Sequence, residues 1–372
     1  MYRWVQVMKT MHQRCFLAVR KTWTSGSLGS LVSFMLKNMV GTWRFINFGQ
    51  TKDSNRPSVL TKKSKITQNK QIVKSITISI KKIIVFCVFL FLLLSIYLIW
   101  GKLTSPYGVQ KVSFIPSKSE KFTKGKLSFE IYRASTGVNQ DIIYHFHGRN
   151  LDNTIWNDDT YYTALIQSYW QKSNIKPPTV VLVSYGPEWL LTPKNSRVES
   201  GLMDDFVSNL PLIESKIGKP KNRILLGESM GGLNVLILGL SHPELFSRVA
   251  SLCPGVYLDS PFSDFNDIKA AIKRTGADPK IALGIYKIAR TYASNEEEWQ
   301  EISPIHLIKR ANSHYPELYL SCGLYDKYGN FEGTEALANV ANLKGVKTRW
   351  HPLYGGHCAI DITSLADFLI IN

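Results

Sequence analysis

Acidic side chains are almost absent from the first 82 residues of this 372-residue sequence. That segment holds 16 Lys and Arg residues and a single acid, Asp53, whereas residues 83–372 hold 29 Lys and Arg residues and 27 Asp and Glu residues. The excess of positive charge therefore belongs to an N-terminal tail, and the rest of the chain is nearly neutral. A basic tail can indicate nucleic-acid binding. The apolar run that follows offers another explanation that needs no such partner, because Lys and Arg are enriched on the cytoplasmic side of a membrane span.

Charge is absent altogether from Ile83 to Trp100. As a helix this run would be about 27 Å long, which matches one hydrocarbon core. Six Lys precede it in residues 63–82, and three Lys and one Glu follow it in residues 101–120, so the N-terminus is expected in the cytoplasm. The sequence thus predicts a single-pass membrane protein with four parts: a basic cytoplasmic tail (1–82), a transmembrane helix (83–100), a stalk (101–125) and an extracytoplasmic domain (126–372).

Within the tail, two interpretations stand side by side. Apolar residues between Leu28 and Trp43 recur at helical spacing, which is typical of a helix lying on an anionic membrane surface. A start codon assigned too early would produce a basic leader of the same kind in residues 1–50. The polar and basic residues 51–75 are typical of a linker.

CxxC pairs, other metal-ligand spacings and an H-E-x-x-H pattern are also absent, so we expect no metal and no cofactor. Cys15 and Cys87 fall in the tail and in the apolar run. We interpret Cys253, Cys322 and Cys358 as buried small apolar residues. A Cys322–Cys358 or Cys253–Cys322 bridge is the alternative, and no spacing supports either.

Short apolar runs alternate with helical patterns after residue 126, and helical stretches such as 204–217 and 232–240 lie between them. Several runs are apolar throughout, as in strands that are buried on both faces. The alternation predicts an α/β domain with a doubly wound, mostly parallel sheet. The expected strands are 127–133, 142–146, 180–184, 223–227, 249–253, 318–322 and 348–352.

One motif carries chemistry, the sequence GESMG at residues 227–231. It follows a short apolar strand and precedes an apolar helix, which is the setting in which G-x-S-x-G presents a nucleophile on a sharp turn. The flanking glycines let the chain turn without Cβ clashes, and the helix N-terminus brings a partial positive charge. We therefore predict Ser229 as a nucleophile.

A serine hydroxyl needs a positioned base, and in this architecture an acid and then a histidine follow the serine in chain order. Asp326 and His357 each come just after a predicted strand, in that order. We predict that His357 takes the proton of Ser229 and that Asp326 orients His357. Glu332 is the reserve acid, and His351, which falls inside a strand, is the reserve base.

Two backbone N–H groups should stabilise the oxyanion. One is expected from Met230, next to the nucleophile. The other is expected from Gly148 or Arg149, because His147–Gly148 ends an early strand as in HG-type oxyanion loops. The Arg149 side chain would contact an anionic group of the substrate or solvent.

Four segments together resemble one known group: HFHG at 145–148, the stretch 225–255 that contains SHPELF, CGLYD at 322–326 and YGGH at 354–357. They are similar to the esterase D/putative-esterase branch of the α/β hydrolases, with S-formylglutathione hydrolase, feruloyl esterases and antigen 85-type mycolyltransferases. The resemblance spans about residues 126–372. It implies an α/β-hydrolase fold, the roles given above for Ser229, Asp326 and His357, and a helical cap over 256–305. Arg149–Asn150 and Cys253–Pro254 depart from the family pattern.

The sequence therefore predicts a membrane-anchored serine hydrolase that cleaves an ester through an acyl-enzyme. The nearest alternative is an O-acyltransferase or deacetylase acting on acylated glycans of the cell envelope. An alternative of another class is a non-catalytic binding module on a hydrolase scaffold, although all three catalytic positions are filled.

Overall fold

A computed structural model of the chain describes residues 59–103, 111–192, 201–310 and 315–371. The chain divides into two compact units, Met1–Tyr97 and Leu98–Asn372, and each is described by itself.

The first unit is described from Val59, where the 45-residue helix α3 (Val59–Leu103) begins. The linker prediction for residues 51–75 is wrong from Val59 onward, because that part contains neither Gly nor Pro and is rich in good helix formers. The predicted surface helix between Leu28 and Trp43 lies outside the described residues. Within α3, Ile80–Gly101 is apolar and long enough to cross a membrane, with a mean hydropathy of 3.0 and none of it buried.

The second unit contains an eight-stranded sheet in the order β1-β2-β4-β3-β5-β6-β7-β8. The β1–β2 and β2–β4 pairs are antiparallel, and the other five pairs are parallel. The strands are β1 (Lys118–Lys124), β2 (Leu127–Arg133), β3 (Ile142–Phe146), β4 (Thr179–Ser184), β5 (Arg223–Glu228), β6 (Arg248–Leu252), β7 (Glu317–Gly323) and β8 (Thr348–Leu353).

The strands β2 to β8 lie where the sequence predicts them, to within one residue at either end. Strand β1 lies inside residues 101–125, which were predicted as a stalk, and that prediction is wrong here because β1 pairs with β2 along its whole length. Its sequence, KSEKFTK, is charged and almost entirely exposed. An edge strand protected by lysines has no apolar alternation to detect.

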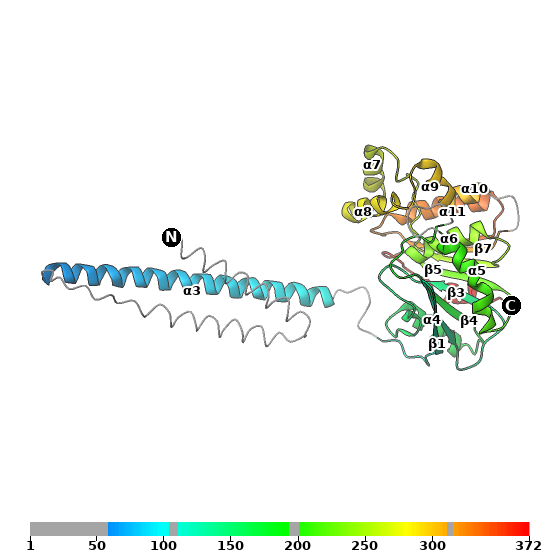
Figure 1. The fold of residues 1–372 in the computed structure, drawn as a ribbon, viewed down its shortest axis with the longest axis horizontal. Coiled ribbons are helices and arrows are strands. Elements are labelled where there is room, and N and C mark those ends of the chain that lie inside the picture. Colours follow the sequence, from blue (N-terminus) through cyan, green and yellow to red (C-terminus); the bar gives the residue numbers. More distant parts are fainter. Residues whose placement is uncertain (1–58, 104–110, 193–200, 311–314, 372) are drawn as a thin grey trace. The chain divides into compact units, whose positions relative to one another are not determined.

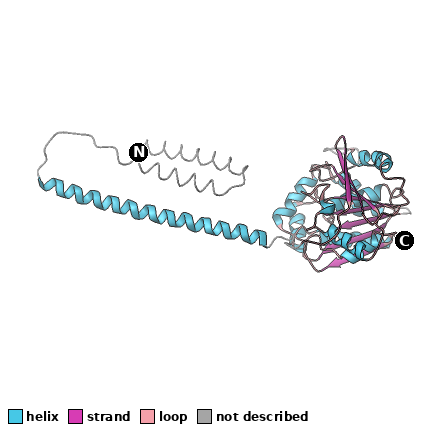
Figure 2. Ribbon diagram, turned by 90° about the horizontal axis from the view of Figure 1, so that it is seen from below, coloured by secondary structure: helices cyan, strands magenta, loops and turns pink. Residues whose placement is uncertain are grey.

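Helices cover both faces of the sheet (Figures 1 and 2). Side chains alternate along each strand between two cores, so that Tyr144 faces one core and Ile143 the other. Helices α5, α6 and α11 pack into the first core, and α4 and α12 pack into the second. Their bounds are α4 (Tyr162–Lys172), α5 (Leu202–Ser215), α6 (Met230–Ser241), α11 (Asn330–Leu343) and α12 (Ile362–Phe368), with the 3-10 helix η1 (Ile155–Asn157) beside α4.

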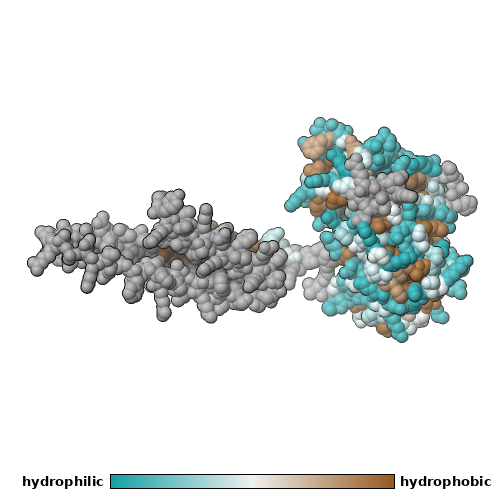
Figure 3. Space-filling view, viewed as in Figure 1, coloured by the Kyte–Doolittle hydropathy of each residue, from teal (hydrophilic) through white to brown (hydrophobic). Residues whose placement is uncertain are grey.

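The region predicted as a cap, 256–305, is helical and gathers at one end of the domain (Figure 1). Asp264, Asp278 and Asn295 each accept a hydrogen bond from the first turn of the helix that they precede. The face of the domain in Figure 3 is mostly hydrophilic, with scattered hydrophobic residues. The helices are α7 (Phe265–Thr275), α8 (Pro279–Ala289), α9 (Glu296–Ile302) and α10 (Pro304–Lys309).

A very close backbone approach places α6 against β3. A Cβ added to Gly231 would overlap with the backbone carbonyl of Phe146, and a Cβ added to Gly227 would overlap with the backbone of Gly231. Only glycine therefore fits at these two positions, and the start of α6 can lie directly beside the end of β3.

We expect Gly231→Ala to lower the free energy of unfolding by about 3 kcal/mol, the upper end for overpacking, because the backbone cannot yield to the new methyl group. The matched control is Gly284→Ala in the exposed middle of α8, where a Cβ would meet nothing within 4 Å. That change should raise stability by about 0.5–1 kcal/mol through the higher helix propensity of Ala. Thermal unfolding followed by near-UV circular dichroism measures both, and equal midpoints would contradict the packing argument.

Candidate active site

Ser229 lies on a sharp turn between β5 and α6. Its φ of 55° and ψ of −113° are unusual for a residue with a side chain. The Ser229 N–H donates to Leu252 O at 2.8 Å, and Ser229 O accepts from Leu233 N at 3.0 Å. These bonds to the neighbouring strand and to the first turn of α6 hold the strained residue, and they leave its hydroxyl half-buried at the end of the sheet.

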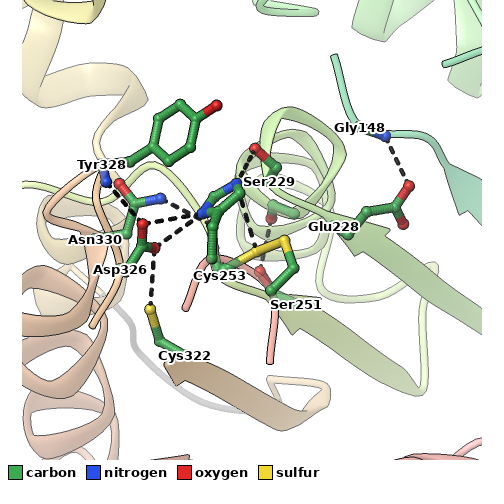
Figure 4. The surroundings of a disulfide bond; sticks show 12 residues. Gly148, Glu228, Ser229, Ser251, Cys253, Cys322, Asp326, Tyr328 and Asn330 are labelled. Carbon is green, nitrogen blue, oxygen red and sulfur yellow. Dashed lines mark hydrogen bonds and ion pairs between the residues drawn. A yellow bond between two sulfur atoms is a disulfide. The ribbon is translucent and has the colours of Figure 1, made fainter. Parts of the chain in front are cut away.

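Three side chains from separate loops form a continuous hydrogen-bonded chain (Figure 4). The Ser229 Oγ lies 2.9 Å from His357 Nε2, and His357 Nδ1 lies 3.0 Å from each carboxylate oxygen of Asp326. With Nδ1–H donating to the carboxylate, Nε2 is left as the acceptor for the serine proton. The structure thus brings together the three residues that the sequence singled out.

Asp326 is buried, with 3% of its surface exposed, and it is held by further donors. Its Oδ1 accepts from the Tyr328 N–H at 2.8 Å, and its Oδ2 accepts from the Cys322 Sγ–H at 3.4 Å. The Tyr328 ring packs against the His357 ring, with centroids 4.1 Å apart. Acid and imidazole are therefore fixed in one orientation.

The two reserve residues have other partners. Glu332 forms an ion pair with Arg274, at 2.7 Å between Oε1 and Nε, and Arg274 also contacts Asp259. His351 is inside β8, stacks on Tyr319 with centroids 4.4 Å apart, and has a pKa lowered by burial. Neither residue contacts Ser229.

The turn at Ser229, the predicted nucleophile, is called the nucleophile turn below. The loop after β3, residues 147–150, lies beside it, and we call this loop the β3 loop. The Gly148 N–H already donates to Glu228 Oε1 at 2.7 Å, so it is not free to meet a substrate oxygen. No described residue accepts a hydrogen bond from the Arg149 N–H, and the Arg149 side chain is exposed. Met230 is the first residue of α6, where the backbone N–H has no partner within the helix.

Glu228 and its partner Tyr162 were missed by the sequence reasoning. Glu228 is only the variable position of G-x-S-x-G, and its carboxylate receives bonds from His145, Gly148 and Tyr162. The one available signal was an acidic residue that follows the apolar run 224–226 and Gly227, since a buried acid requires hydrogen-bond donors.

The interpretation of all three domain cysteines as unpaired is wrong, because Cys253 and Cys358 form a disulfide with Cα atoms 5.1 Å apart. The pairs weighed from sequence, Cys322–Cys358 and Cys253–Cys322, are not formed. The loop after β8 crosses the end of β7, where Gly323 leaves room for the backbone of Gly355 and Gly356, and so reaches the end of β6. Cys322 keeps a free, buried thiol whose pKa is raised by burial.

Metal ligation has little support in the described part of the chain. The one cluster with suitable atoms is Cys253, His357 and Cys358, and its two sulfurs are bonded to each other. His147 has both ring nitrogens in use, with Nδ1 donating to Gly148 O and Nε2 accepting from Ser184 Oγ, each at 2.8 Å. Burial lowers the pKa of His147, which favours this neutral form.

Comparison with known sequences gives one family. Residues 120–359 match the profile of the family described as "Putative esterase". A search of curated proteins found no significant match.

Solved structures resemble the domain closely enough to establish its fold. An arylesterase aligns with a TM-score of 0.51 at 19% identity, covering 70% of this chain and 86% of its own. An esterase/lipase from an uncultured bacterium (TM-score 0.50, 17% identity) covers 70% of this chain and 86% of its own. The HSL homologue EstE7 from a metagenome library (TM-score 0.50, 17% identity) covers 69% of this chain and 87% of its own. At these identities the likeness concerns the fold alone.

Replacing both Cys253 and Cys358 with Ala should lower the free energy of unfolding by about 2–5 kcal/mol, because the bond joins residues 105 apart in sequence. Thermal unfolding of the full chain in detergent, followed by near-UV circular dichroism, measures the loss. Cys322→Ala is the control, since it removes a buried sulfur but no cross-link. A double variant that melts with the control would contradict a stabilising bond.

Proposed function

Because the chain belongs to the putative esterase family, we propose that it cleaves esters through a covalent acyl-enzyme formed on Ser229. The observation that supports this most directly is the continuous hydrogen-bonded chain from Ser229 through His357 to Asp326. A nucleophile, a base and an orienting acid in that geometry are the requirements of acyl transfer. The family supports ester cleavage as the reaction class, and the hydrogen-bonded chain supports the assignment of these residues.

In the first half of the reaction, Ser229 Oγ attacks the acyl carbonyl carbon while its proton passes to His357 Nε2. The tetrahedral intermediate collapses when His357 returns that proton to the leaving alcohol, and the acyl group stays on Ser229. Water then attacks the acyl-enzyme with His357 again as the base, which releases the acid and restores the serine. Asp326 stabilises the imidazolium in both halves.

The developing oxyanion requires donors that point at the reacting carbon. We assign these donors to the backbone N–H groups of Met230 and Arg149. Met230 opens α6, whose N-terminus carries a partial positive charge. Arg149 is preferred over Gly148 because the Gly148 N–H already binds Glu228.

A sugar hydroxyl in place of water would make the same site an O-acyltransferase. One observation favours a large acceptor. Tyr325 and Tyr354 are 66% and 85% exposed, their rings contact each other, and they lie on the loops that carry Asp326 and His357. Exposed aromatic rings at a site offer an apolar face for a ligand.

The full chain in detergent should be labelled by a fluorophosphonate probe at Ser229 and should hydrolyse short-chain p-nitrophenyl esters. We expect Ser229→Ala and His357→Ala each to reduce kcat by about 10⁴- to 10⁶-fold, and Asp326→Asn by about 10⁴-fold through loss of the correct imidazole tautomer. Glu332→Gln is the control, because that carboxylate pairs with Arg274 away from the serine.

A folded wild-type chain that takes no probe would contradict the enzyme and favour a binding module. Activity that survives in Ser229→Ala would exclude the mechanism. Product analysis with and without added sugar separates hydrolysis from acyl transfer.

We further propose that α3 anchors the protein and that the domain faces away from the cytoplasm. The apolar part of α3 is long enough for one membrane crossing. Lys81 and Lys82 lie at its N-terminal end, within a strongly basic segment, which favours a cytoplasmic tail. The Cys253–Cys358 disulfide favours an oxidising compartment for the domain.

Protease added to intact cells that express the chain should digest the domain and leave a membrane-protected fragment containing residues 1–100. In inverted membrane vesicles the same protease should remove the tail and leave the domain intact. The reverse pattern would contradict this orientation. A soluble chain after cell lysis would contradict the anchor itself.

A further inference from the structure

A buried acid lies directly before the nucleophile, and the reaction scheme above does not use it. Glu228 is the last residue of β5, and only 2% of its surface is exposed. A carboxylate in such a place is costly unless donors surround it.

Three donors converge on this carboxylate. Its Oε1 accepts from the Gly148 N–H at 2.7 Å, which Figure 4 shows as a contact between the end of β5 and the β3 loop. Its Oε2 accepts from His145 Nε2–H at 2.7 Å and from the Tyr162 hydroxyl at 2.9 Å. The side chain of one residue thus joins the nucleophile turn, strand β3, the β3 loop and helix α4.

The donors also keep the group ionised. Burial alone would raise the pKa of Glu228, but His145, Gly148 and Tyr162 stabilise the anion, and its pKa lies below the ordinary value. His145 Nδ1 is buried and has no hydrogen-bond partner among the described residues. The hydrogen bond from this ring to Glu228 is therefore made through Nε2.

The contact between Gly148 and Glu228 lies next to one of the proposed oxyanion donors. Gly148 immediately precedes Arg149, whose N–H is one of the two donors assigned above, and Glu228 immediately precedes Ser229. A rigid link between Gly148 and Glu228 therefore sets the distance between the Arg149 donor and the reacting serine. The Glu228 side chain also packs directly against Gly148, because a Cβ added to Gly148 would lie 3.4 Å from Glu228 Cγ.

We propose that Glu228 is a positioning residue that clamps the β3 loop onto the nucleophile turn, so that the Arg149 N–H faces the oxyanion. The inference rests on the proposed esterase function. Glu228 does not touch the substrate in this arrangement, and it acts through Gly148. Its removal should weaken transition-state stabilisation more than substrate binding.

The chain offers a matched control on the opposite face of the sheet. Glu214 is also buried, and it accepts from the Tyr144 hydroxyl at 2.9 Å and from Arg223 Nε at 2.6 Å. Tyr144 and His145 are neighbours in β3 and face opposite cores. The two acids thus hold the same strand, but only Glu228 contacts the β3 loop.

The experiment compares Glu228→Gln, Glu228→Ala, Glu214→Gln and Glu214→Ala in the full chain in detergent, with p-nitrophenyl acetate as the substrate. We expect kcat to fall about tenfold for Glu228→Gln, which retains an acceptor for Gly148, and about 100-fold for Glu228→Ala, with KM within about twofold of wild type. Binding of a trifluoromethyl ketone, which forms a tetrahedral adduct with the serine, should weaken in parallel. Both Glu214 variants should lose thermal stability but keep kcat within about twofold.

Tyr162→Phe is the second variant, in case Glu228→Ala does not fold. It removes one donor from Oε2 and leaves the Gly148 contact, so a smaller loss of kcat is expected than for Glu228→Gln. Glu228→Gln with wild-type kcat and wild-type ketone affinity would overturn the proposal, and so would equal kcat losses in the Glu214 variants. A wild-type chain without esterase activity would instead overturn the proposed function, and this inference with it.

Discussion

The close approach of α6 to β3 is the contact on which the rest of the site depends. Gly231 lies against the Phe146 carbonyl with no room for a side chain, and Gly227 in β5 lies similarly close to the backbone of Gly231. The intervening Ser229 has a strained conformation with positive φ at the end of β5. The packing also places the β3 loop next to the N-terminus of α6, which carries a partial positive charge.

The parallel sheet turns this local arrangement into a site. Strands β3, β5, β7 and β8 end at the same edge, so the loops that follow them meet although their residues are far apart in the chain. Two buried carboxylates each bind a different loop at this edge. Asp326 fixes His357, and Glu228 fixes Gly148. Each carboxylate accepts several hydrogen bonds, which a buried acid requires.

The disulfide secures the part of the site that lacks regular structure. Cys358 directly follows His357, and Cys253 directly follows β6, the strand that binds the Ser229 backbone. Both cysteines have positive φ, and Asn330 Nδ2 donates to Cys253 O at 3.0 Å. The loop that carries His357 is thereby tied to the strand beside Ser229.

Local patterns in the sequence predicted strands β2 to β8, the turn at Ser229, the apolar helix, and Asp326 and His357 as residues at strand ends. These features depend on periodicity and on short motifs, which neighbouring residues determine. The sequence did not reveal β1, because a charged edge strand has no apolar face. It also did not reveal the Cys253–Cys358 pair or the donors around Glu228. These depend on contacts between residues 66 to 105 positions apart, such as Gly148 with Glu228, which only the packed sheet brings together.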